Sequence, residues 1–267
     1  MMSEAPLLKL DNITRNFGAI EALKGISFEI ARGEVVALLG DNGAGKSTLV
    51  KIISGFLPAT SGKMSFEGSE RSFASPAEAK AAGIETVYQD LSLCTNVDVV
   101  ANFFMGREIV KRYFGIPILQ EAAMYEATAK AIANAGTKIP SLRVNVENLS
   151  GGQRQAIELN RFVHWGGKLV LLDEPFAALG VEQTRRGLEM VKQIASQGIG
   201  VVFITHIMAQ AFQVADRIVV IRQGKVAGDM AASQTSPDEV VRMITGEAII
   251  TGEANGARAQ ETRPNGP

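Results

Sequence analysis

The chain has 267 residues, 46% of them hydrophobic, which suffices for one substantial core or a core with a smaller lobe. Its net charge of −1 and isoelectric point of about 6.2 exclude the basic surface typical of nucleic-acid-binding proteins, so no nucleic-acid partner is expected. A single cysteine, Cys94, excludes an internal disulfide framework and fits a reducing compartment.

The N-terminal stretch MMSEAPLLKLDN has no basic segment followed by an apolar one, so no signal peptide is expected. No apolar run approaches the ~18–20 residues that a membrane-spanning helix needs. We therefore expect a soluble chain that reaches a membrane only through a partner.

Short strand-like segments recur along the chain, and several are continuous apolar runs typical of strands buried on both faces. They are LLKLDNI from Leu7, GISFEI from Gly25, EVVALLG from Glu34, KMSFEG from Lys63, GIETVY from Gly83, KLVLLDE from Lys168, GVVFIT from Gly200 and RIVVIRQG from Arg217. Helical patterns lie between them at Lys46–Ser54, Glu182–Ser196 and Ile207–Ala215. This alternation predicts an α/β fold with a mainly parallel sheet.

A phosphate-binding loop follows the third of these segments. The motif G-x-x-x-x-G-K-S, from Gly40 to Ser47, lies between a predicted buried strand and a predicted helix. Its glycines let backbone N–H groups surround an anion, Lys46 supplies positive charge, and Ser47 offers a hydroxyl to Mg²⁺. The alternative is a glycine-rich turn that merely precedes a helix. The predicted nucleotide-binding residues are Gly40, Asp41, Asn42, Gly43, Ala44, Gly45, Lys46, Ser47 and Thr48.

The middle of the chain, from Asp98 to Trp165, is predicted to be mainly helical, with one proline-bearing break at FGIPIL. The segment EAAMYEATAKAIANAG is rich in helix formers and ends at Gly136, a plausible C-cap. We interpret this region as an inserted helical subdomain. The last residues, 247–267, lack apolar periodicity, and we expect a disordered tail there.

A second anion-binding helix start is predicted within NLSGGQRQAIELNRF. Ser150 can cap the helix, and the glycines after it expose backbone N–H groups. Further on, the buried segment KLVLLDE ends in two adjacent acids. Asp173 is placed to bind a magnesium ion, and Glu174 is placed to polarise the water that attacks the γ-phosphate. The alternative for this D-E-P sequence is an ordinary surface turn.

The sequence L-S-G-G-Q resembles the signature of the ATP-binding-cassette family. That family's other motifs are matched in order by Phe17, an aromatic that stacks on adenine, by Gln89 in VYQDLSL, and by His206 in FITH. The resemblance covers roughly Leu7–Gly246. It implies a P-loop NTPase core with an N-terminal antiparallel β subdomain and an inserted helical subdomain.

The resemblance also implies a division of the chain and roles for its residues. The nucleotide-binding core would comprise residues 1–97 and 166–246, with the helical subdomain and signature at 98–165. Catalytic roles fall to Glu174, His206, Gln89 and Lys46, metal contacts to Ser47, Gln89 and Asp173, and further nucleotide contacts to Phe17, Ser150, Gly151, Gly152 and Gln153. Two cassettes would sandwich two ATP molecules, each held by one phosphate loop and the partner's signature.

Finer similarity points to the ATPases of bacterial monosaccharide importers of the ribose, xylose and fructose type, in a single-cassette form. It implies ATP and Mg²⁺ as cofactors, and a second cassette and permease subunits as partners, with a periplasmic sugar-binding protein acting indirectly. It also implies a peripheral location at the cytoplasmic face of the bacterial inner membrane. The alternatives are an ATPase for another small solute, a soluble non-transport cassette ATPase, or a nucleotide kinase.

Some residues depart from the family pattern. Phe176 stands where a small hydroxyl residue is usual, and Gly180 replaces an aspartate, as in the monosaccharide subgroup. We expect Phe176 either to pack against the helical lobe or to narrow the site. Glu158–Asn160 is more polar than expected, and His164, which belongs to no motif, is expected to be structural.

Overall fold

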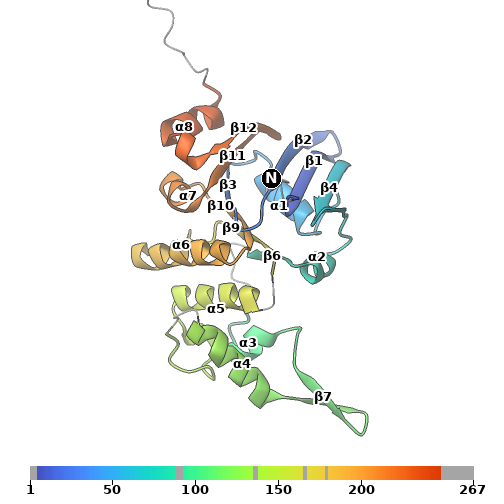
Figure 1. The fold of residues 1–267 in the computed structure, drawn as a ribbon, viewed down its shortest axis with the longest axis vertical. Coiled ribbons are helices and arrows are strands. Elements are labelled where there is room, and N and C mark those ends of the chain that lie inside the picture. Colours follow the sequence, from blue (N-terminus) through green and yellow to red (C-terminus); the bar gives the residue numbers. More distant parts are fainter. Residues whose placement is uncertain (1–4, 88–92, 135–137, 165–166, 178–179, 248–267) are drawn as a thin grey trace, which may run out of the picture.

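The computed structural model describes residues 5–87, 93–134, 138–164, 167–177 and 180–247. At its centre is a six-stranded sheet of order β12-β11-β3-β10-β9-β6 (Figure 1). Its strands are β3 (Val35–Leu39), β6 (Ile84–Val87), β9 (Leu169–Asp173), β10 (Gly200–Ile204), β11 (Arg217–Arg222) and β12 (Lys225–Ala231). Neighbouring strands run parallel except β11 and β12. The predicted α/β fold with a mainly parallel sheet is confirmed.

Helices and a second sheet cover the two faces of this sheet. Alternate residues of its strands point to opposite sides. Val36, Leu38 and Val202 pack on one side against α1 (Lys46–Ile53) and the N-terminal strands. On the other side lie α6 (Val181–Ser196), α7 (Met208–Val214) and α8 (Pro237–Thr245), with their own apolar clusters. The central strands are therefore buried on both faces, which explains their continuous apolar sequences.

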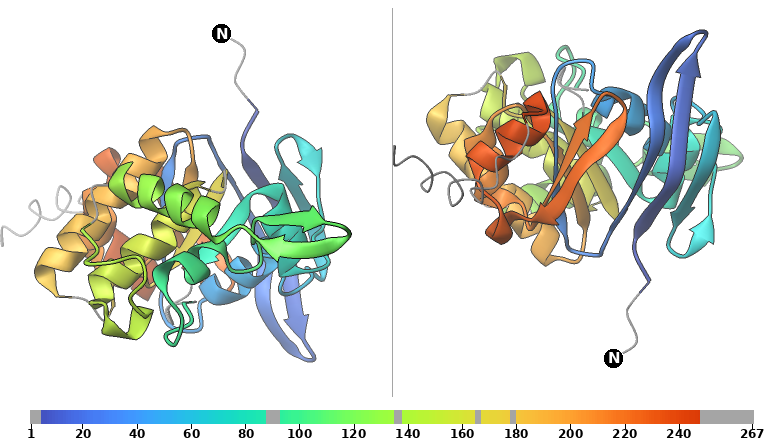
Figure 2. Two further views of the ribbon diagram at one scale, coloured as in Figure 1. Left: turned by 90° about the horizontal axis from the view of Figure 1, so that it is seen from below. Right: turned by 90° about the horizontal axis from the view of Figure 1, so that it is seen from above.

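The N-terminal strands form a separate antiparallel sheet of order β2-β1-β4-β5 (Figure 2). They are β1 (Leu8–Phe17), β2 (Ile20–Ile30), β4 (Ser61–Phe66) and β5 (Ser69–Glu70). The hairpin joining β1 and β2 ends at the pair Phe17–Ile20. This sheet is the antiparallel β subdomain that was expected. A short helix, α2 (Pro76–Ala82), leads from it to β6.

Three helices between β6 and β9 share a further apolar cluster: α3 (Val99–Phe104), α4 (Glu121–Asn134) and α5 (Gly151–His164). Short 3₁₀ turns lie at Val146–Asn148 and Ala232–Gln234. Among the described residues, no helix combines the length and apolar character needed to cross a bilayer. Gly136, offered as the C-cap of α4, lies outside the described residues, as do residues 248–267 of the predicted tail.

The segment FGIPIL breaks the helical region between α3 and α4, as expected from the sequence, although its strand structure was not predicted. It forms the turn and second strand of a hairpin, β7 (Val110–Tyr113) and β8 (Ile116–Leu119). Phe114 and Gly115, at the turn, have φ angles of 49° and 83°. Two successive positive φ angles are what a two-residue type I′ turn requires, and its twist matches that of the flanking strands.

Candidate nucleotide site

The loop Gly40–Ser47 joins the carboxyl end of β3 to α1 in the conformation that its glycines permit. Gly40 has a φ of 152°, and a Cβ there would lie 2.1 Å from the carbonyl oxygen of Ile221. Gly45 has a φ of 113°, and its Cβ would meet Leu23 and Ala22 of β2. No side chain caps the start of α1. The backbone thus presents a helix N-terminus suited to an anion, as predicted for a phosphate loop.

Lys46 lies across this loop, where its Nζ donates to the carbonyl oxygens of Gly40, at 2.7 Å, and Asp41, at 3.0 Å. Burial lowers the pKa of Lys46, while the carboxylates of Glu174, Asp173 and Asp41 act in the opposite direction. The ammonium is therefore partly desolvated and close to the two acids after β9. A bound phosphate would compensate such a charge more fully than carbonyl dipoles do.

Asp173 and Glu174 diverge because the backbone turns between them. Asp173 is the last residue of β9 and pairs with Ile204 of β10, which in turn pairs with Leu38 of β3. Glu174 has a φ of 51°, and its N–H donates to the carbonyl oxygen of Ile204 at 3.0 Å. A left-handed conformation is rare for glutamate, and the bond to β10 holds it there. Both acids therefore lie at the sheet edge from which the phosphate loop departs.

Burial raises the pKa of Asp173, and the neighbouring charge of Glu174 raises it further, although Lys46 and Lys51 act against this. The Ser47 hydroxyl and the Asp173 carboxylate are hard oxygen ligands of the kind that Mg²⁺ prefers. A cation would also relieve the repulsion that raises the pKa of Asp173. Among the described residues, no group of three or more His, Cys, Asp or Glu side chains could hold a metal. The Ser47 hydroxyl and the Asp173 carboxylate fit a magnesium ion that is held together with nucleotide phosphates.

His206 follows β10 and contacts the second acid directly, with its Nδ1 2.9 Å from Oε2 of Glu174. The imidazole is largely exposed, whereas the Glu174 side chain is mostly covered. The buried Thr205 beside it fixes the turn, since its hydroxyl accepts from the N–H of Ile207 and bonds the side chain of Gln210. The two predicted catalytic residues, which follow the neighbouring strands β9 and β10, are thus brought into hydrogen-bond contact.

Phe17 lies at the end of the β1–β2 hairpin with much of its ring exposed and the guanidinium of Arg15 4.8 Å from the ring centroid. Backbone bonds tie β2 to the phosphate loop: Gly224 N–H donates to Ala44, and Lys24 N–H donates to Gly224. The middle of β2 is therefore anchored beside the loop, and the partly exposed ring of Phe17 lies at the end of the same hairpin.

The signature segment begins α5 with reciprocal bonds between a serine and a glutamine. The Gln153 N–H donates to Oγ of Ser150, which confirms Ser150 as the N-cap, and the Ser150 N–H donates to Oε1 of Gln153. Gln153 Nε2 also donates to the carbonyl oxygen of Lys138. The start of this helix lies against α6, where a Cβ on Gly152 would be 3.0 Å from the side chain of Gln183. Gln153 is thus engaged in capping, a role that the sequence analysis did not assign.

Gln89 lies outside the described residues. Residues 94–98 are held by Asn102, which was not singled out from the sequence. The buried amide of Asn102 accepts from the N–H of Cys94 and donates toward the carbonyl oxygens of Cys94, Val97 and Asp98. An asparagine within the otherwise apolar run VVANFF was the available signal, because a buried amide must be hydrogen-bonded.

Within the described side chains, the contacts of Phe176 are with the core between the central sheet and α6, rather than with the helical lobe or the nucleotide site. Its side chain is 2% exposed and lies in the cluster between the sheet and α6, with its ring centroid 5.7 Å from that of Phe203. A Cβ on Gly187 of α6 would lie only 2.3 Å from this ring. Phe176 is therefore a core residue whose place depends on a glycine in the facing helix.

The other residues that stood out beside the family pattern lie at a helix start or within the helical region. Gly180 is the N-cap of α6 and offers no capping side chain. Glu158 and Asn160 are both buried in α5, and the Asn160 amide donates to the carbonyl oxygen of Ala156. The ring of His164 lies 5.2 Å from that of Phe103, and burial lowers its pKa. The ring contacts of His164 with Phe103 and Phe104 are of the kind that packing residues make.

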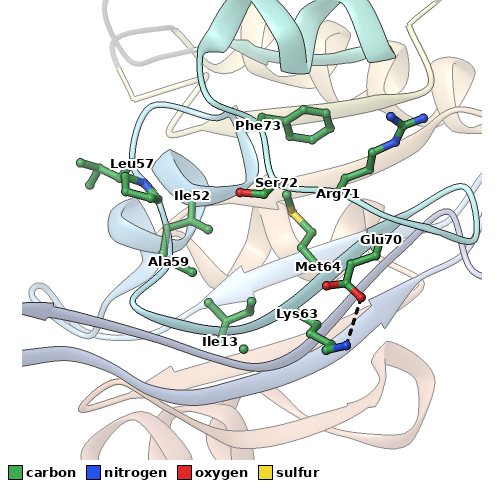
Figure 3. Close-up of a pocket in the computed structure, with 12 residues that line it drawn as sticks. Ile13, Ile52, Leu57, Ala59, Lys63, Met64, Glu70, Arg71, Ser72 and Phe73 are labelled. Carbon is green, nitrogen blue, oxygen red and sulfur yellow. Dashed lines mark hydrogen bonds and ion pairs between the residues drawn. The ribbon is translucent and has the colours of Figure 1, made fainter.

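A separate pocket of about 410 Å³ lies between the N-terminal sheet and the C-terminal end of α1 (Figure 3). Its apolar side chains include Ile13, Ile52 and Met64, and the ion pair between Lys63 and Glu70 lies at its edge. None of the predicted site residues lines it. This pocket is therefore not part of the candidate site, which consists of the phosphate loop, the two acids and His206.

Comparison with known proteins agrees with this geometry. The family model described as ABC transporter matches residues 23–177. A xylose/arabinose import ATP-binding protein of Sulfolobus acidocaldarius is 43% identical over 243 residues, which cover 91% of this chain and 95% of that protein. A fructose import ATP-binding protein of Rhizobium meliloti is 38% identical over 92% of this chain and 96% of its own length.

The ribose import ATP-binding proteins of Yersinia pestis are 34% identical, and this chain spans only 48% of their length. A crystal structure of a nucleotide-free ATP-binding cassette from an ABC transporter superposes with a TM-score of 0.77. It is 25% identical and covers 90% of this chain and 98% of that one. The phosphate loop, the acids after β9 and these similarities agree: the chain belongs to the ABC transporter family and is its ATP-hydrolysing cassette.

Proposed function

We propose that this chain is the ATP-hydrolysing subunit of an importer for a monosaccharide. One observation carries the proposal: the phosphate loop, Asp173 and the hydrogen-bonded pair Glu174–His206 meet at one edge of the parallel sheet. The sugar class rests on the relatives, whose names include xylose/arabinose, ribose and fructose import.

Within this proposal each residue has a defined task. Lys46 and the loop N–H groups bind the β- and γ-phosphates, and Ser47 and Asp173 hold the magnesium ion, directly or through water. When bound, Mg²⁺ would neutralise negative charge on the phosphate oxygens. Glu174 accepts a proton from the attacking water, and His206, bonded to its Oε2, holds the carboxylate in place. Phe17 stacks on adenine, and Gln89 links the site to the transport partner.

The site is completed by a second copy of the chain. The capped helix start at Ser150 lies against α6, and we assign the N–H groups of Gly151 and Gly152 to ATP held by the partner. Val181, beside Gly180 at the start of α6, is 91% exposed, as expected for a residue at such an interface. We also propose the division into 1–97, 98–165 and 166–246, with 247–267 as a tail.

The importer proposal places the dimer on permease subunits at the cytoplasmic face of the inner membrane, with a periplasmic sugar-binding protein delivering the solute. The test is purification of the tagged chain from membranes, with identification of bound proteins, followed by reconstitution in vesicles. A permease should co-purify, and one monosaccharide should stimulate ATP hydrolysis several-fold while other solutes do not. Recovery with ribosomes or DNA instead, or stimulation by a non-sugar solute alone, would contradict the proposal.

A further inference from the structure

The β7–β8 hairpin is an exposed apolar projection. Figure 1 shows it extending from the end of the molecule opposite α8. Every residue of both strands is exposed, and Phe114, at the turn, is exposed completely. A lone two-stranded hairpin is marginally stable in water. Its exposed apolar side chains belong to one continuous projection, and such patches commonly mark a binding surface.

The apolar and basic residues occur at different distances from the turn. Phe114 is at the tip, followed by the facing pair Tyr113 and Ile116. Arg112 and Lys111 come next, about 7 and 10 Å back along the strand at the usual rise per residue. Neither side chain forms an ion pair within the part of the chain that the structure describes. Lys111 Nζ lies 5.2 Å from the ring centroid of Tyr113.

Both faces of the hairpin are apolar. Directly opposed residues share a face, so Tyr113 and Ile116 point to one side and Val110 and Leu119 to the other. A protein that packs against one face would leave the other in water. Close to the turn, the apolar residues are Phe114 at the tip, Tyr113 and Ile116 on one face, and Pro117, opposite Arg112, on the other. An interface into which the tip inserts covers all of these together, which favours a lipid surface over a protein groove.

We propose that the tip of this hairpin inserts into the interface of a bilayer that carries anionic headgroups. Interfacial segments bury their apolar side chains about 5–10 Å deep at the boundary between headgroups and acyl chains. Inserted to that depth, Phe114 and Ile116 reach the boundary, while Arg112 and Lys111 lie at the level of the phosphates. Tyr113 has the amphipathic ring that is enriched at membrane interfaces. The chain thus contacts lipid itself, whatever solute the transporter carries.

The first test is flotation of the purified full chain with vesicles of phosphatidylcholine, alone or mixed with phosphatidylglycerol. The chain should float with the mixed vesicles. The double variant Phe114→Ser/Ile116→Ser should partition at least about tenfold more weakly, because two buried apolar side chains are lost. The matched control is Phe56→Ser, which removes an aromatic ring of 59% exposure elsewhere on the molecule and should bind as the parent does.

The second test separates the basic residues from the apolar tip. Lys111→Gln/Arg112→Gln should bind the mixed vesicles about tenfold more weakly and neutral vesicles unchanged, since basic side chains near an anionic surface each add to binding. Added salt should weaken parental binding by screening. The control Lys9→Gln/Lys225→Gln removes two exposed charges from other strands.

Three results would overturn the inference. The parent chain does not float, or the parent and the Phe114→Ser/Ile116→Ser variant float equally. The third is that this variant loses co-purification with the permease while its vesicle binding stays intact. The last would make the hairpin a protein-docking element. The flotation test contains no nucleotide, sugar or permease. It therefore succeeds or fails independently of the proposed transport function.

Discussion

At the scale of single residues, the adjacent acids Asp173 and Glu174 lie in different surroundings because the backbone changes conformation between them. Asp173 ends a strand, whereas Glu174 is left-handed and hydrogen-bonded through its N–H to Ile204. Its carboxylate thereby meets His206 rather than its own neighbour. The turn gives the two carboxylates different surroundings, as the proposed roles of metal binding for Asp173 and water activation for Glu174 require.

Replacing Glu174 with glutamine should abolish turnover and preserve ATP binding. The amide keeps the size of the side chain but cannot accept the proton of the attacking water, a function commonly worth ~10²–10⁴-fold in rate. Phosphate release and nucleotide affinity should be measured side by side. Glu29→Gln, an exposed carboxylate in β2, is the control and should change neither. Near-normal hydrolysis by Glu174→Gln would remove Glu174 from the proposed role.

The raised pKa of Asp173 predicts that Mg-nucleotide affinity falls as the pH is lowered through that pKa. Burial and Glu174 favour the protonated form, whereas a cation requires the carboxylate. For folding the sign is opposite: a raised acid pKa means that this group favours the folded state at low pH, and that contribution is lost as the pH rises.

Calorimetric titration of a non-hydrolysable ATP analogue with Mg²⁺ over a pH series measures this dependence. The Asp173→Asn variant should bind more weakly at neutral pH and show a flatter pH profile, because the titrating group is gone. An identical pH slope in the variant and the parent would assign the titration to another residue.

At the scale of elements, α6 approaches the sheet closely because Gly187 leaves space for the ring of Phe176. Alanine is ordinarily the better helix former by ~0.8–1.0 kcal/mol, so Gly187→Ala would stabilise an isolated helix. Here the new Cβ would lie 2.3 Å from a buried ring, and overpacking costs about 1–3 kcal/mol. We therefore expect net destabilisation of the protein.

Chemical denaturation of a double-mutant cycle tests this contact. Phe176→Leu should relieve the crowding, so that Gly187→Ala is less costly in that background than in the parent. Gln193→Ala, on the exposed side of α6, is the control and should change the free energy of unfolding by less than about 0.5 kcal/mol. Equal costs of Gly187→Ala in both backgrounds would show that the two side chains do not interact.

The sequence predicted those elements whose patterns are local. The apolar runs of β3, β9 and β10 and the loop after β3 have strong local signals, and the structure places them as expected. The S-P-x-E sequences that cap α2 at Ser75 and α8 at Ser236 were equally local but overlooked. The β7–β8 hairpin was missed because its proline suggested a helix break, although a Phe-Gly turn between an aromatic residue, Tyr113, and a β-branched one, Ile116, was present.

The packing of Phe176 could not be predicted from local pattern. Its environment depends on Gly187 in the following helix and on Phe203 in β10, which come together only in the folded chain. The bond between Glu174 and His206 likewise depends on the order of β9 and β10 in the sheet. The sequence motifs therefore predicted which residues form the site, whereas the contacts between those residues follow from the order of the strands in the sheet.

At the scale of the whole molecule, the proposed dimer predicts that two inactive variants restore activity when mixed. Lys46→Ala removes the phosphate-binding ammonium, and Ser150→Arg blocks the signature that faces the partner's ATP. In a mixed dimer one site carries both lesions, while the other combines an intact phosphate loop with an intact signature. With half of the dimers mixed and one site active in each, hydrolysis should recover to at most about a quarter of the parental rate.

Each variant alone should hydrolyse ATP at a small fraction of the parental rate, because every site of its homodimer carries a lesion. Thermal unfolding should first establish that Ser150→Arg remains folded, since Ser150 caps α5. A mixture of Lys46→Ala with the doubly substituted chain Lys46→Ala/Ser150→Arg serves as the control, because neither of its sites has an intact loop. If two folded variants fail to complement, the signature serves its own chain's nucleotide, and the head-to-tail arrangement is wrong. Recovery in the mixture, absent from the control, requires that a loop and a signature from different chains meet at one ATP.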